Sequence, residues 1–240
     1  MLITNASIVA SQSLSFVTTD EDYPPYTYTD KNGQASGIYV ELAKQVAQSL
    51  EQEVSFYALP WRRASALARQ GKIDVLLIAY DIPENRRNFW IIPGNELGTT
   101  SYTICTLKEH PAIDKNKRIT ELPEKLTINT VDGYDYAFSA RQDISLNTQA
   151  IGRSEPHLIS LLLGRRLEAI LIEQSTLDFH PRKKELCCLE EKIIGATEFI
   201  AFSKAATSRQ QAVNFSSAMQ EFKKSPAFKA LLNKYQIKAL

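Results

Sequence analysis

One short apolar run, from Ile73 to Ala79, constrains the fold of this chain more than any other stretch. The run consists mostly of β-forming and small residues, is too short for an independent helix and lacks the alternation of a half-exposed strand. It therefore predicts a buried strand in the middle of a mostly parallel sheet. Because ligands collect beyond the carboxyl ends of such strands, Tyr80 and Asp81 are predicted at a binding site. The loop that follows them ends in two arginines, Arg86 and Arg87.

Strands and helices alternate before this run. Apolar, β-prone residues predict strands at 14–19 and 54–59. Apolar residues at helical spacing predict one helix that begins at Gly37 and another that Pro60 opens and Gly71 ends. The order strand, helix, strand, helix, strand predicts βαβ units with right-handed crossovers.

A second set of elements follows a charged segment with two prolines, residues 108–125, where we place a boundary between two lobes. A β-prone run at 99–107 leads into that segment. The second set begins with strands or extended pieces at 126–131 and 146–151 and with helices at about 134–141 and after a cap at Ser154. Later strands are predicted at 186–189 and 197–203, and two amphipathic helices, at 208–223 and 226–237, close the chain.

Part of the second set repeats the first. The segment LLLGRRLEAILIE has the same character as LARQGKIDVLLIAY: a helix end, a glycine, a basic residue, an aliphatic residue, an acid and an apolar strand. Residues 167–172 then correspond to residues 73–78. The repeat predicts two lobes of like construction, each with a binding loop after its strand, and it sets Glu173 opposite Tyr80 and Asp81.

Charge and hydropathy exclude some functions. The chain has 240 residues, and 28 Lys and Arg against 27 Asp and Glu leave a net charge of +1 without a basic stripe. Nucleic acid is therefore not an expected partner. The longest apolar runs fall well short of the roughly 20 residues that cross a bilayer. Residues 1–13 carry no lysine or arginine and so lack the charged start of a secretory signal, which was removed, truncated or never present.

Cysteines and histidines give no metal motif. Cys105, Cys187 and Cys188 are odd in number and include an adjacent pair, so we interpret them as small apolar residues, with one disulfide from Cys105 left open. The three histidines at 110, 157 and 180 share no ligand spacing. We expect no metal and no cofactor.

The chain resembles the extracytoplasmic solute-binding proteins of bacterial ABC importers, in the amino-acid-binding-like group (family 3) with the type II periplasmic fold. The resemblance covers about residues 14–235, and several motifs in this order and spacing carry it: DEDYPPYTYTDKNGQASGIYVELAKQVA, PWRRASALARQGKIDVLL with IPENRR behind it, LPEKLTINTVDGYDYAF, GRRLEAILIE and FIAFSK.

The fold that the resemblance implies is α/β with two lobes, each a mostly parallel sheet flanked by helices, joined by two crossing strands as a hinge. Its expected divisions are lobe one at 1–103 and 204–240, lobe two at 104–203, and hinge strands near 99–107 and 197–203.

Site residues are implied by the same resemblance. Arg86 matches the arginine that grips a ligand carboxylate, and a guanidinium suits that task because it binds carboxylates bidentately. Tyr23 matches an aromatic residue that stacks on the ligand, with Tyr26 near it. Asp20 matches an acid used for cationic side chains, and Glu173 matches the acid that takes the ligand ammonium.

The remaining candidate site residues either match further family positions or differ from the residue types usual there. The backbone N–H groups after Gly133 match a helix-start anion cradle. Tyr80 and Asp81 stand where small hydroxyl residues usually precede the arginine, and Tyr134 stands where a hydroxyl residue usually follows the glycine. Trp61 is placed either to line the cleft or to cap the core.

The implied function is binding of a small polar solute, an amino acid or a related carboxylate, by cleft closure for ABC import or sensing. Expected partners are the solute and an ABC permease or membrane receptor, and we expect a periplasmic monomer without catalytic residues. The alternative is an enzyme on the same scaffold, a lyase similar to cyclohexadienyl dehydratase, with Glu173 or Asp81 as general acid. A third reading is the sensor module of a larger receptor.

Overall fold

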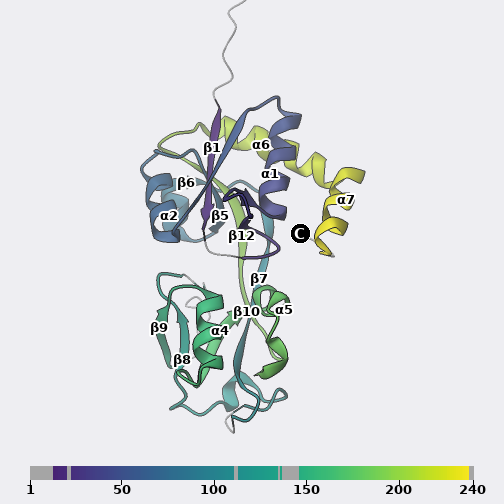
Figure 1. Ribbon diagram of the computed structural model, residues 1–240. Coiled ribbons are helices and arrows are strands. Elements are labelled where there is room, and N and C mark those ends of the chain that lie inside the picture. Colours follow the sequence, from purple (N-terminus) through teal and green to yellow (C-terminus); the bar gives the residue numbers. More distant parts are fainter. Residues whose placement is uncertain (1–12, 21–22, 111–112, 135, 137–145, 238–240) are drawn as a thin grey trace, which may run out of the picture.

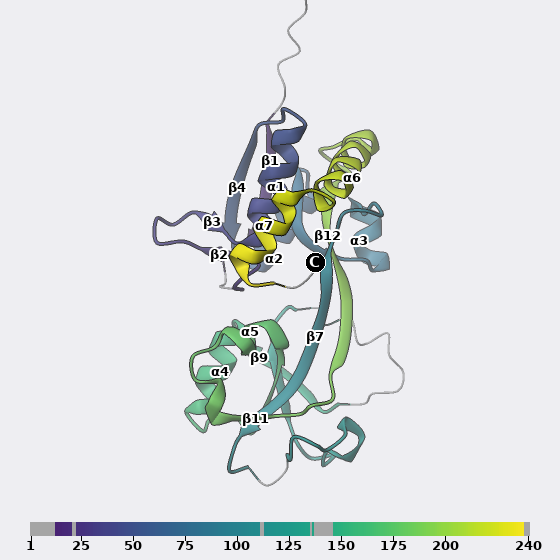
Figure 2. The ribbon, with the colours of Figure 1, turned by 90° about the vertical axis from the view of Figure 1, so that its right-hand side faces the viewer.

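Two lobes joined by two long strands make up the computed structural model, which describes residues 13–20, 23–110, 113–134, 136 and 146–237. The strands are β7 (Glu96–Leu107) and β12 (Ile193–Ser203), which pair antiparallel and run from one lobe into the other (Figure 1). Turning the molecule shows β7 spanning both lobes along its full length (Figure 2). The predicted fold class is confirmed, and the predicted boundary positions at 103/104 and 203/204 stay predictions.

Lobe one is built on the predicted buried strand. Strand β5 (Val75–Tyr80) lies between β1 (Leu14–Thr19), to which it is parallel, and the crossing strand β12, to which it is antiparallel. Strand β4 (Val54–Leu59) is parallel to β1 on the far side. The strand begins two residues later than predicted, because the Asp74 carboxylate accepts hydrogen bonds from the backbone and hydroxyl of Ser15.

Four helices cover this sheet as the apolar spacing predicts. Helices α1 (Ile38–Ser49) and α2 (Trp61–Arg69) form the two crossovers. Helices α6 (Arg209–Lys223) and α7 (Pro226–Tyr235) return to lobe one, where they pack near α1 (Figure 1). Ser208 and Ser225 cap the two C-terminal helices, each accepting a hydrogen bond from a backbone N–H three residues on.

Lobe two repeats this plan. Strand β10 (Ala169–Glu173) lies between the parallel strand β8 (Ile128–Val131) and the antiparallel crossing strand β7, as β5 does in lobe one. Strand β9 (Thr148–Gly152) is parallel to β8, and α4 (Glu155–Leu163) leads back to β10 after its cap at Ser154. The predicted correspondence between residues 73–78 and 167–172 is therefore confirmed in three dimensions.

Several short elements were not predicted. The loop that we expected at 82–87 is helix α3 (Pro83–Asn88), because Pro83 at its first position fixes φ, Glu84 lies in its first turn and two arginines lie in its last turn. The others are β2 (Tyr28–Thr29), β3 (Ala35–Ser36), β6 (Phe89–Trp90), α5 (Gln174–Phe179) and the 3₁₀ turns Ile119–Glu121 and Lys183–Glu185. The predicted helix at 134–141 falls largely outside the described residues.

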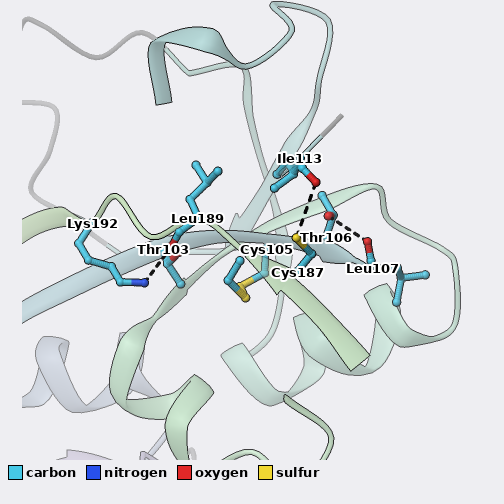
Figure 3. The surroundings of a disulfide bond; sticks show 9 residues. Thr103, Cys105, Thr106, Leu107, Ile113, Cys187, Leu189 and Lys192 are labelled. Carbon is cyan, nitrogen blue, oxygen red and sulfur yellow. Dashed lines mark hydrogen bonds between the residues drawn. A yellow bond between two sulfur atoms is a disulfide. The ribbon is translucent and has the colours of Figure 1, made fainter. Parts of the chain in front are cut away.

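A disulfide joins Cys105 to Cys188 (Figure 3). The two residues lie opposite each other where β11 (Leu186–Cys188) pairs antiparallel with β7. The interpretation of all three cysteines as apolar residues is therefore wrong for this pair, because it depends on a strand pairing between segments 83 residues apart. Cys187 points away, its Sγ 3.6 Å from the carbonyl oxygen of Ile113, and is a free thiol.

Removing the disulfide should destabilise the protein. A link across 83 residues restricts the unfolded chain strongly, so replacing Cys105 and Cys188 together by alanine should lower the free energy of unfolding by about 4 kcal/mol. Urea unfolding with and without reductant measures the effect. The variant Cys187→Ala is the control and should unfold like the wild type, with the same sensitivity to reductant. A double variant as stable as the wild type would show that the bond does not form in solution.

Candidate functional site

A cavity of about 290 Å³ lies between the lobes. The carboxyl ends of the parallel strands β1, β5, β8 and β10 meet there, as predicted for this kind of sheet. Helix α2 presents one face to it, since residues 61, 65 and 69 recur at helical spacing. The lining residues are Thr19, Tyr23, Trp61, Ser65, Arg69, Ile78, Ala79, Tyr80, Ile82, Glu84, Asn85, Tyr102, Gly133, Tyr134, Ser154, Glu155, Pro156, Glu173, Thr176 and Glu198.

Three buried carboxyl groups face this cavity. Glu155 at the start of α4, Glu173 at the end of β10 and Glu198 on β12 are only 5%, 8% and 3% exposed. Glu173 Oε1 accepts hydrogen bonds from the hydroxyls of Tyr23 (2.5 Å) and Ser175 (2.6 Å).

Their other hydrogen bonds stay within the protein. The Glu173 backbone N–H donates to Glu155 Oε1 at 3.0 Å, and Tyr39 donates its hydroxyl to Glu198 Oε2 at 2.8 Å. All three acids are thus held in place by the fold.

Burial raises the pKa of two of these acids. The pKa of Glu198 rises from 4.5 to about 7, because removal from water disfavours the charged carboxylate. Burial also raises the pKa of Glu173 well above its ordinary value, and the charges of Glu198 and Glu155 raise it further. A neighbouring positive charge would restore the ionised form of both groups.

Aromatic rings form much of the remaining wall. Tyr80 comes from β5 and Tyr102 from β7, the strands on either side of β12, and their hydroxyls lie 2.8 Å apart. Burial raises the pKa of both phenols, so they stay neutral. Tyr23, Trp61 and Tyr134 supply further rings.

Two polar contacts join the lobes beside the cavity. The hydrogen bond from Tyr23 to Glu173 runs from lobe one to lobe two. Arg62 Nη2 lies 2.9 Å from both carboxylate oxygens of Asp132. Gly133 has a φ of +80°, which favours glycine, and a Cβ there would lie 2.7 Å from Arg62 Nε, so a larger residue would displace the Arg62 side chain.

Six of the ten predicted site residues line the cavity: Tyr23, Trp61, Tyr80, Gly133, Tyr134 and Glu173. Asp20 is exposed outside it. Tyr26 lies behind Tyr23, with ring centroids 4.9 Å apart, and also packs on Tyr39. The anion cradle predicted after Gly133 falls mainly on residues outside the described part of the chain.

Arg86 lies on the outer side of α3 rather than in the cavity. Its side chain is 62% exposed, and its guanidinium pairs with Asp81, with Nη2 2.5 Å from Oδ2. Glu84 and Asn85 are the α3 residues that line the cavity, and Asn85 donates its amide N–H to the carbonyl of Tyr80 at 2.9 Å. Neighbouring helical positions point about 100° apart. This geometry does not support the predictions that Arg86 binds a ligand carboxylate and that Asp81 lies at the ligand. Both stay predictions.

Several lining residues escaped the sequence reasoning. The most informative is Glu198, an acid within the apolar run TEFIAFS, which is the same signal that singled out Glu173. Tyr102 gave no comparable signal, because only the pairing of β7 with β10 sets it opposite Glu173. The described residues contain no cluster of His, Cys, Asp or Glu able to hold a metal. They also contain no helix with the length and apolarity needed to span a membrane.

Two α/β lobes around a cavity at the strand ends define a two-lobed binding protein. The family model of bacterial extracellular solute-binding proteins, family 3, matches residues 16–238, and the chain belongs to this family.

Relatives and solved structures agree with this assignment. The chain is 20% identical over 233 residues to an arginine-binding periplasmic protein of Mannheimia haemolytica, covering 95% of this chain and 93% of the relative. It is 23% identical over 226 residues to the L-cystine-binding protein TcyJ of Escherichia coli, covering 89% and 79%. A histidine kinase sensor domain similar to periplasmic binding proteins has the same fold, with a TM-score of 0.78, 18% identity and coverage of 93% and 96%.

A cyclohexadienyl dehydratase of Pseudomonas aeruginosa matches a shorter part of the chain. It is 25% identical over 92 residues, which is 38% of this chain and 34% of that enzyme. One partial relative is therefore an enzyme, whereas the family that matches this chain is described as solute-binding proteins.

The raised pKa of Glu198 predicts how the stability of the ligand-free protein depends on pH. A carboxyl whose pKa rises on folding stabilises the fold below about 4.5, and this stabilisation is lost as the pH rises through about 7. The loss should be about 3 kcal/mol, and Glu173 adds to it in the same direction.

Urea unfolding between pH 4.5 and 8.5 measures this dependence. Glu198→Gln should flatten it, since a neutral amide does not titrate and can still accept the hydrogen bond from Tyr39. An unchanged slope in that variant would contradict the prediction.

Proposed function

We propose that the protein binds an amino acid or a related small polar solute between its lobes and presents it, outside the cytoplasm, to an ABC permease or a membrane receptor. The position of the cavity carries the proposal, because its walls come from both lobes and from both crossing strands. A solute held there contacts both lobes at once, so its binding favours the closed arrangement.

The size and setting of the cavity support this proposal. Its volume of about 290 Å³ lies at the lower end of ligand cavities, which suits a solute as small as an amino acid. The disulfide between Cys105 and Cys188 suits an oxidising compartment such as the periplasm. The relatives named for arginine and L-cystine binding support the amino-acid class.

Intrinsic fluorescence tests the proposal directly. The chain has two tryptophans: Trp61 lines the cavity, and Trp90 packs outside it, beneath the Lys204 ammonium. A solute that enters the cavity should change the emission of Trp61. We expect Trp61→Phe to abolish the ligand-induced change and Trp90→Phe to retain it.

Thermal shift assays with a panel of amino acids and amines identify the solute to use. A solute at 100 times its Kd should add about 2.7 kcal/mol of stability. A binding solute whose signal comes from Trp90 instead of Trp61 would place the site elsewhere and overturn the proposal.

A lyase on this scaffold is the second candidate function, and the raised pKa of Glu173 is the observation that favours it. A buried carboxyl group with a raised pKa keeps its proton to higher pH and can act as a general acid. The expected substrates, carboxylated rings such as prephenate or arogenate, would lie against several acids, which disfavours them. Product analysis after incubation with either compound tests the candidate: turnover that Glu173→Gln abolishes would support the lyase, and absence of turnover would eliminate it.

A further inference from the structure

Three arginines beside the cavity are already paired with carboxylates of the protein. The pairs are Arg62 with Asp132, Arg69 with Glu84, and Arg86 with Asp81. Of these arginines, Arg69 lines the cavity, and its Nη1 lies 2.5 Å from Glu84 Oε1. A ligand carboxylate at this wall would therefore have to compete with an acid that is already bound.

The acids within the cavity have the opposite arrangement. Glu173 and Glu198 accept hydrogen bonds from hydroxyl groups, and across the described ranges no lysine or arginine lies within ion-pair distance of either. Buried carboxylates normally have a cation as partner. The two acids therefore offer a place for a positive charge that the described protein does not fill.

A second observation also points to a ligand. Thr176 on α5 lines the cavity and is 4% exposed, yet its hydroxyl makes no hydrogen bond. Buried hydroxyls are nearly always bonded, so this one suits a polar group of a ligand. The rings of Tyr23, Trp61 and Tyr80 supply π faces, which attract cations and repel anions.

We propose that the solute recognised here is an organic cation without a carboxylate group, an aliphatic amine or guanidine held by Glu173 and Glu198 among the aromatic rings. This inference rests on the proposed function and narrows its substrate class. An α-amino acid could place its ammonium on the same acids, but its carboxylate would face Glu84 or the buried acids, with Arg62, Arg69 and Arg86 already engaged. Losing the carboxylate should therefore strengthen binding.

Calorimetric titration at pH 8 with matched pairs of compounds tests this inference. The pairs are arginine with agmatine and lysine with 1,5-diaminopentane, in which the second compound lacks only the carboxylate. We expect at least one amine to bind about tenfold or more tightly than its parent amino acid. Equal or tighter binding of the amino acids, or binding confined to neutral or anionic solutes, would overturn the inference and leave the proposed function standing. Failure of every small solute to bind would overturn both.

Variants test whether Glu173 and Glu198 cause the preference for amines. Glu173→Gln and Glu198→Gln should each weaken binding of the preferred amine about tenfold or more, because an amide cannot pair with a cation. Glu185→Gln is the matched control: Glu185 is exposed, pairs with Arg182 and lies outside the cavity, so binding should be unchanged. Thermal unfolding checks that each variant is folded. Folded Glu173→Gln and Glu198→Gln proteins that bind the amine as tightly as the wild type would overturn the assignment.

Discussion

The antiparallel pairing of β7 with β12 is the interaction on which the rest of the structure depends. These two strands belong to both lobes, so one continuous sheet, ordered β4-β1-β5-β12-β7-β10-β8-β9, joins the two hydrophobic clusters of lobe one to the cluster of lobe two. The pairing also forms part of the cavity wall, since Tyr102 lies on β7 and Glu198 on β12. Any change in the angle between the lobes must therefore bend the strands that carry two cavity residues.

Irregular pairing shows where such bending is easiest. The register between β12 and β7 shifts between Ile194 and Thr197 and again between Glu198 and Phe199. Gly195 lies in the first shift, and a Cβ there would lie 2.1 Å from Thr100 Oγ1, so the strands approach too closely for a larger residue. Bulges bend a strand and redirect its side chains. The second shift directly follows Glu198, which couples the orientation of this acid to the geometry of the hinge.

The sequence predicts what local patterns encode. The structure confirms strands 14–19 and 54–59, the two C-terminal helices and the repeat at 167–172, which follow from apolar spacing and β-forming residues. The disulfide and the position of Tyr102 depend instead on which distant strands pair, which no local pattern records. Arg86 illustrates the same limit within one helix. If residues 82–87 are interpreted as a loop, the directions of their side chains cannot be predicted. In the structure the segment is a helix, in which Asn85 lines the cavity and Arg86 points away from it.

The charge of the cavity, more than the fold, determines which solute can bind. A scaffold of this kind occurs in proteins named for arginine binding, L-cystine binding and sensing, so the fold leaves the solute open. Glu173 and Glu198 have raised pKa values. In the ligand-free cavity these two acids are therefore either protonated or ionised at a cost in stability. A cationic solute removes that penalty as it brings the lobes together. The attraction between the cation and the two acids then favours both binding and closure. A neutral solute of equal size would gain only from contact and hydrogen bonds.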